Sequence, residues 1–133
     1  MVDFPEASRS ALAPVHLYAS APDISIYSSH IHRLVECCAR SLFGISAAAF
    51  RSRERAGSVA LARQTAMYLS HVAFGLTFTE TGRLFDRDRT TVAHACAVVE
   101  DLRDNPAMDR ALTILETALF KLRPDGPLSR EID

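Results

Sequence analysis

The chain has 133 residues, 48% of them hydrophobic and 23% charged, and these values fit one folded globular domain. Its formal net charge of −1 at pH 7 argues weakly against nucleic-acid binding, because most nucleic-acid-binding domains are basic. No apolar run approaches the roughly 20 residues of a membrane span, and the start of the chain lacks the features of a signal peptide, so we expect a cytoplasmic protein without membrane contact.

The two ends of the chain lack a sustained hydrophobic period. Residues 1–23 contain three prolines and are predicted to form an N-terminal arm, either partly ordered on the domain or disordered. Residues 124–133 contain two prolines and a glycine and are predicted to form a flexible tail. The folded domain is therefore expected to span residues 24–123.

The first predicted helix ends at Gly44, a residue that commonly terminates helices. Ser46 is predicted to cap a short helix that runs through Phe50. The first helix is indicated by apolar residues at helical spacing: Tyr27, Ile31, Leu34, Val35, Cys38 and Leu42.

An arginine-rich stretch, residues 51–57, is predicted to be a loop. Ser58 is predicted to cap the next helix, which ends at Gly75. The apolar face of that helix is expected to consist of Val59, Ala62, Ala66, Leu69 and Ala73.

Thr77 and Glu80 have the spacing of a capping box and are predicted to begin a short helix that ends near Phe85. Residues 86–88 are predicted to form a tight turn, whose last residue caps a helix that begins at Arg89. The residues which that helix is expected to bury are Val92, Ala95, Cys96, Val99 and Leu102.

Asn105 followed by Pro106 is typical of a helix start and predicts a final helix. Its apolar stripe is expected to consist of Met108, Leu112, Leu115 and Leu119. No segment alternates in the way that a strand does. The sequence therefore predicts an all-α fold, a compact bundle of about five or six helices.

Cysteine and histidine residues do not show the spacing of a metal site, and no catalytic motif such as H-E-x-x-H or a nucleophile elbow occurs. We therefore predict no metal, no cofactor, no small-molecule substrate and no enzyme activity. The three cysteines are expected to be buried or half-buried reduced thiols: Cys37, Cys38 and Cys96.

Basic residues are concentrated in one part of the chain. Residues 51–63 carry four arginines, Arg51, Arg53, Arg55 and Arg63, against the single acidic residue Glu54. Nearly all basic residues of the chain are arginine. Two explanations are open: a GC-rich genome favours arginine codons, and guanidinium groups fit phosphates and guanine edges.

Residues 77–85 and 88–103 have the size and the break of a helix-turn-helix, in which the start of the second helix enters the major groove. The four side chains at that start suit base edges or phosphates: Asp88, Arg89, Thr90 and Thr91. Spacing alone also fits an ordinary helical hairpin, in which Asp88, Thr90 and Thr91 only cap a helix.

The residue identities are more specific than the spacing. Residues 87–96, RDRTTVAHAC, resemble the signature Arg-Asp-His-Thr-Thr-Val-x-His-Ala of the C-terminal DNA-binding domain of the bacterial replication initiator DnaA. Residues 63–69, RQTAMYL, resemble the Arg-Gln-x-Ala-Met-x-Leu helix of that family, and residues 51–55 fall in the place of its basic loop. The resemblance covers roughly residues 26–122 and implies sequence-specific binding of double-stranded DNA by a nucleoid-associated transcription or replication regulator.

The resemblance also implies roles for single residues. The family places a basic-loop arginine in the minor groove, and Arg55 occupies that position, while Arg63 and Gln64 match a pair that contacts the major groove or the backbone. Residues 88–91 match the base-contacting segment, and His94 is interpreted as a structural or phosphate-side residue. The predicted DNA-binding residues are Arg53, Arg55, Arg63, Gln64, Thr79, Arg87, Asp88, Arg89, Thr90, Thr91 and His94.

The chain departs from the family pattern at several of these places. Arg89 replaces the first signature histidine, and the turn after Phe85 is one residue shorter than the usual two, often Gly-Gly. Glu54 lies inside the basic loop, and Leu61 and Ala62 stand where many members carry arginine and proline. The DnaA box is therefore not assumed to be the target sequence.

The chain has no G-x-x-x-x-G-K-[ST] motif, so we expect a stand-alone relative of the DNA-binding domain without the ATPase domain. An alternative is a protein-binding regulator of replication initiation that acts on DnaA or its partners and binds little DNA. The negative net charge and the weakened basic loop favour that alternative. The sequence does not predict the oligomeric state.

Overall fold

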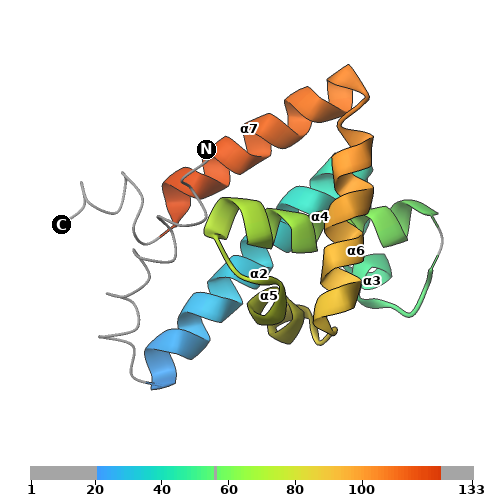
Figure 1. The fold of residues 1–133 in the computed structure, drawn as a ribbon. Helices are drawn as coiled ribbons and strands as arrows, with labels where there is room; N and C mark the ends of the chain where they lie inside the picture. The colour runs from blue at the N-terminus through green and yellow to red at the C-terminus, as the bar shows by residue number, and fades with distance from the viewer. Residues whose placement is uncertain (1–20, 56, 124–133) are drawn as a thin grey trace.

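The computed structural model describes residues 21–55 and 57–123, which form helices and contain no strand (Figure 1). The helices are α2 (Ala21–Phe43), α3 (Ala47–Arg51), α4 (Gly57–Phe74), α5 (Phe78–Phe85), α6 (Arg89–Leu102) and α7 (Pro106–Leu122). The prediction of an all-α bundle of five or six helices is confirmed.

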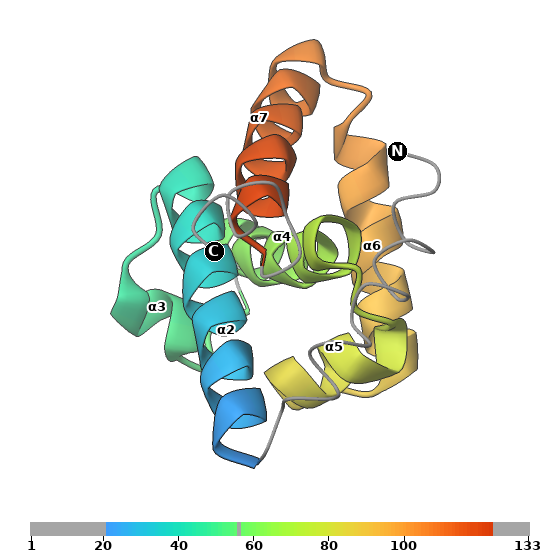
Figure 2. The same ribbon diagram turned by 90° about the vertical axis from the view of Figure 1, so that its left-hand side faces the viewer.

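Helix α4 lies at the centre of the bundle and contacts each of the other five described helices (Figures 1 and 2). A central helix must be apolar on several sides, whereas a surface helix needs one apolar face. All five residues predicted for one face of α4 are buried, and so are five others: Thr65, Met67, Tyr68, Ser70 and Phe74. The predicted face of α4 is therefore correct, but the buried surface of this helix is wider than that one face.

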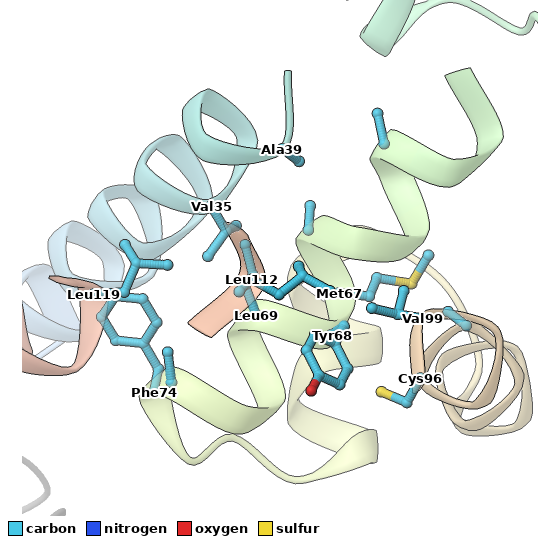
Figure 3. Packing of buried hydrophobic residues seen from close by; sticks show 14 of the residues in the cluster. Val35, Ala39, Met67, Tyr68, Leu69, Phe74, Cys96, Val99, Leu112 and Leu119 are labelled. Carbon is cyan, nitrogen blue, oxygen red and sulfur yellow. The ribbon is translucent and has the colours of Figure 1, made fainter. Parts of the chain in front are cut away.

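The core joins helices from both sides of α4. Figure 3 shows Val35 of α2 and Leu119 of α7 on one side, and Val99 of α6 on the other, around Leu69 and Phe74 of α4. Each of these five side chains is at most 2% exposed. Full burial of an aliphatic or phenyl side chain contributes about 1.5–3 kcal/mol, so this core fixes the helices that carry the surface residues.

Several predicted helix starts are confirmed by their hydrogen bonds. The hydroxyl of Ser46 accepts a hydrogen bond from the N–H of Ala49 (3.1 Å), and Thr77 and Glu80 form both hydrogen bonds of a capping box. Asn105 accepts a hydrogen bond from the N–H of Met108 at the start of α7 (3.0 Å).

Two helices begin earlier than the sequence predicts. Helix α2 begins at Ala21, so the last three residues of the predicted arm are helical, and Pro22 is compatible with the first turn because an N–H there has no partner within the helix. Helix α4 begins at Gly57, so Ser58 lies inside the first turn instead of capping it. The remainder of the predicted arm, residues 1–20, and the predicted tail, residues 124–133, lie outside the described residues.

The cysteines are free thiols with different exposure. Cys96 is buried, and burial raises the pKa of its thiol to about 11. Cys38 is half-buried, but Cys37 is exposed, so the prediction of a buried or half-buried thiol was wrong there. The reason is that a helix turns about 100° per residue, which carries one of two adjacent side chains away from the core.

Among the described helices, none has the length and hydropathy to cross a lipid bilayer.

Candidate nucleic-acid interface

The turn between α5 and α6 closes with a Schellman motif, in which two N–H groups return to the end of α5. The N–H of Arg87 donates to the carbonyl of Gly82 (2.8 Å), and that of Asp86 donates to the carbonyl of Arg83 (3.4 Å). Asp86 has a φ of 57°, in the left-handed region, which aspartate tolerates better than most residues. Asp86 thus performs the role that glycine usually has, and the shorter turn still closes.

Gly82 is a residue of this turn that the sequence interpretation missed. It is buried in α5, and a Cβ atom at this position would lie 2.4 Å from the carbonyl oxygen of Arg87. Only a residue without a side chain permits this approach of α5 to the turn. The available signal was a glycine inside an amphipathic helix, which often marks a close backbone contact.

Asp88 caps α6 as predicted. Its Oδ1 atom accepts hydrogen bonds from the hydroxyl of Thr90 (2.6 Å) and from the N–H of Thr91 (2.8 Å). These bonds, that from Thr90 first, lower the pKa of the Asp88 carboxyl below its ordinary value of 3.8. The hydroxyl proton of Thr90 is thereby used within the helix start, which leaves its methyl group and oxygen lone pairs for a ligand.

This cap has a pH dependence that a variant can reveal. A lowered carboxyl pKa stabilises the folded state above the ordinary value of 3.8, and this stabilisation is lost as the pH falls through the folded-state pKa. Asp88→Ala is therefore expected to lower the Tm at pH 7, and the difference from wild type should shrink as the pH falls below 3.8. A difference that stays constant down to pH values near 2 would contradict this origin.

Arg89, the first residue of α6, is exposed and has no hydrogen bond or ion pair with the described residues. Arg87 is also exposed, and its guanidinium donates only a long hydrogen bond to the carbonyl of Asp86 (3.4 Å). Thr79 lies exposed in the first turn of α5, and His94 lies exposed on α6. The exposure of His94 argues against a structural role in the core.

The arginines of residues 51–55 have unequal environments. Arg51 donates a hydrogen bond to the Oε2 atom of Glu36 (2.8 Å), a carboxylate whose side chain is only 3% exposed and which also lies 3.6 Å from Arg40. Arg53 and Arg55 are exposed and form no ion pair with the rest of the described chain. The charge of this loop that is available to a ligand therefore comes from Arg53 and Arg55.

The two residues of the predicted Arg-Gln pair also lie in different environments. Gln64 is partly exposed and has no hydrogen bond to another described residue. Arg63 directs its guanidinium at four backbone carbonyls between residues 49 and 54. Arg63 therefore contacts the basic loop from α4, an arrangement that the sequence did not predict.

The basic loop and the start of α6 lie on one side of the molecule but do not touch. Both lie toward the lower right of Figure 1, whereas Figure 2 separates α3 from α6, with α4 between them. The structure thus presents two separate exposed elements, one led by Arg55 and the other by Arg89.

Comparison with known proteins gives a consistent match. The family model described as the bacterial dnaA protein helix-turn-helix matches residues 32–99, just over half of the chain. The chromosomal replication initiator protein DnaA of Mesorhizobium japonicum is 36% identical over 91 residues, which cover 68% of this chain and 18% of that relative. Those of Desulfotalea psychrophila and Bordetella pertussis are each 38% identical, over 58% of this chain and over 15% and 17% of their own lengths. The chain thus spans less than a fifth of the length of these relatives.

Proposed function

Because the chain belongs to the family of bacterial DnaA helix-turn-helix domains, we propose that it binds double-stranded DNA sequence-specifically and regulates replication or transcription at the nucleoid. In this proposal the chain is a binding protein and not an enzyme. The observation that carries the proposal is the start of α6, where Arg89 stands exposed and without a partner beside the Asp88 cap.

The arrangement of the two exposed elements supports contacts to two grooves. A major groove about 12 Å wide admits one α-helix, and α6 begins with side chains that suit base edges. The loop that carries Arg53 and Arg55 is separated from α6 by α4, so it would meet the duplex at an adjacent minor groove. The backbone N–H groups at the start of α6 would add affinity for phosphate.

Arg89 is expected to set the sequence preference. Its guanidinium can donate two hydrogen bonds to the O6 and N7 atoms of guanine, a pair of bonds that the histidine of the family signature cannot form. Arg89→Ala should therefore cost about 2 kcal/mol, roughly 30-fold in affinity, at one G·C base pair. Competition binding against duplexes that differ at single base pairs measures this, and an equal loss on every duplex would show that Arg89 contacts phosphate instead.

Arg55 is expected to behave differently, because a phosphate or minor-groove arginine contributes to affinity for many sequences. Arg55→Ala should weaken binding to all duplexes alike and reduce the slope of log K against log salt by about 1. Binding measured between low and high salt tests this prediction. A loss confined to one base pair would contradict it.

A selection of bound duplexes from a random pool tests the whole proposal. We expect one enriched motif that contains a G·C pair dependent on Arg89. If the wild-type chain binds no duplex at low salt and retains a replication protein as partner in both the Arg55→Ala and Arg89→Ala variants, the chain is a protein-binding regulator and the proposal is wrong.

A further inference from the structure

The guanidinium group of Arg63 forms hydrogen bonds with the backbone of the basic loop. Its Nε atom donates to the carbonyl of Phe50 (2.8 Å), and its Nη1 atom donates to that of Glu54 (2.5 Å). Its Nη2 atom donates to the carbonyls of Ala49 (3.2 Å) and Ser52 (2.5 Å). Four of the five N–H groups of one arginine are thus used by four residues of α3 and the loop.

The two ends of this contact differ in rigidity. Arg63 is held by α4, the central helix, where its neighbours Ala62 and Ala66 are fully buried. The carbonyls that it contacts belong to a five-residue helix, α3, and to the loop after it. The last carbonyls of a helix have no partner within the helix and carry partial negative charge, so a guanidinium is well matched to them. The rigid helix therefore holds the loop.

The same loop has few other attachments among the described residues. Phe50 anchors α3 in the core, and Arg51 pairs with Glu36 of α2. The hydroxyl of Ser52 donates to the carbonyl of Ala49 (2.7 Å) and accepts from the N–H of Glu54 (3.1 Å), a local turn that does not join the loop to another helix. Among the described residues after Arg51, the hydrogen bonds that join this loop to α4 are donated by Arg63.

We infer that Arg63 is a positioning residue, which holds the loop in the shape that presents Arg53 and Arg55 to DNA, and that it is not itself the main contact to DNA. This inference rests on the proposed function for its consequence, but the loop contact can be tested without DNA. Lysine cannot replace arginine in this role, because a single ammonium nitrogen cannot reach carbonyls that are spread over a planar fork.

Limited proteolysis with trypsin tests the contact directly, because the loop contains Arg53 and Arg55 as exposed cleavage sites. Arg63→Gln and Arg63→Lys are both expected to raise the rate of cleavage at these sites about tenfold or more, while helix content measured by circular dichroism stays at the wild-type level. Gln64→Ala, on the same turn of α4, is the matched control and should leave cleavage unchanged. Unchanged cleavage in both Arg63 variants would overturn the inference.

Binding to the selected duplex tests the consequence. Arg63→Gln is expected to lower affinity about tenfold in the wild-type background but less than twofold in the Arg53→Ala/Arg55→Ala background, because the loop arginines are then absent. An equal loss in both backgrounds would show that Arg63 contacts DNA itself and would overturn the positioning role. If the wild-type chain binds no DNA, the proposed function fails, whereas faster cleavage of the Arg63 variants would still show that Arg63 holds the loop.

Discussion

Replacing Arg103 with alanine is expected to lower the free energy of unfolding by about 2–3 kcal/mol. Arg103 follows the last turn of α6, and its side chain is only 17% exposed. It donates to Asp109 (2.6 Å) and Glu116 of α7, and to the hydroxyl of Tyr68 of α4 (2.8 Å). Alanine would leave these two carboxylates of α7 without their shared cation.

The size of this effect follows from partial exposure. Breaking a fully buried ion pair costs about 3–5 kcal/mol, and a surface pair contributes about 0–1 kcal/mol. The side chain of Glu116 is 21% exposed and therefore half-buried, whereas that of Asp109 is 48% exposed and partly hydrated without its partner. The expected loss therefore lies between the two cases.

Urea denaturation followed by circular dichroism measures the change. The matched control is Arg110→Ala on α7, since Arg110 is exposed and has no ion pair with the described residues, and its loss should stay below about 0.5 kcal/mol. Adding Asp109→Asn and Glu116→Gln to Arg103→Ala should recover part of the stability, because uncharged groups need no cation. Equal losses for Arg103→Ala and Arg110→Ala would show that the cluster is not stabilising.

The helices could be predicted from sequence because their signals are local. The cap residues Ser46, Thr77 and Asn105 act on backbone groups three residues away, so the pattern of the sequence contains both partners. One buried face of α4 follows from helical periodicity in the same way, but its other five buried positions depend on the helices packed on its other sides. The fold class was therefore accessible without any knowledge of contacts between helices.

The different contacts of the four arginines could not be predicted from the sequence. In sequence, Arg51, Arg53, Arg55 and Arg63 form one basic excess, but Arg51 pairs with a glutamate 15 residues away and Arg63 contacts carbonyls 9 to 14 residues away. Such partners depend on how α2, α3 and α4 pack, which periodicity does not specify. The sequence therefore overstated the positive charge that this loop offers to DNA.

The glycine in the helix-turn-helix is the second residue whose substitution should have a large effect. Gly82→Ala is expected to destabilise the domain by about 2 kcal/mol, because the added Cβ atom would lie 2.4 Å from the carbonyl oxygen of Arg87. This oxygen belongs to the backbone of Arg87, whose N–H donates to the carbonyl of Gly82 (2.8 Å) and closes the turn. The clash can be relieved only by moving the turn, and the start of α6 moves with it.

A displaced start of α6 should weaken DNA binding by more than the loss of folding stability alone would. In Gly82→Ala, affinity for the selected duplex should fall more steeply than affinity for unrelated duplexes, since base contacts need exact placement and phosphate contacts tolerate small shifts. Both affinities are measured at a temperature where the variant is fully folded. Gly57→Ala is the matched control, because a Cβ atom there meets nothing within 4 Å, and this variant should keep wild-type stability and specificity. If Gly82→Ala also keeps both, the close approach of α5 to the turn does not set the position of α6.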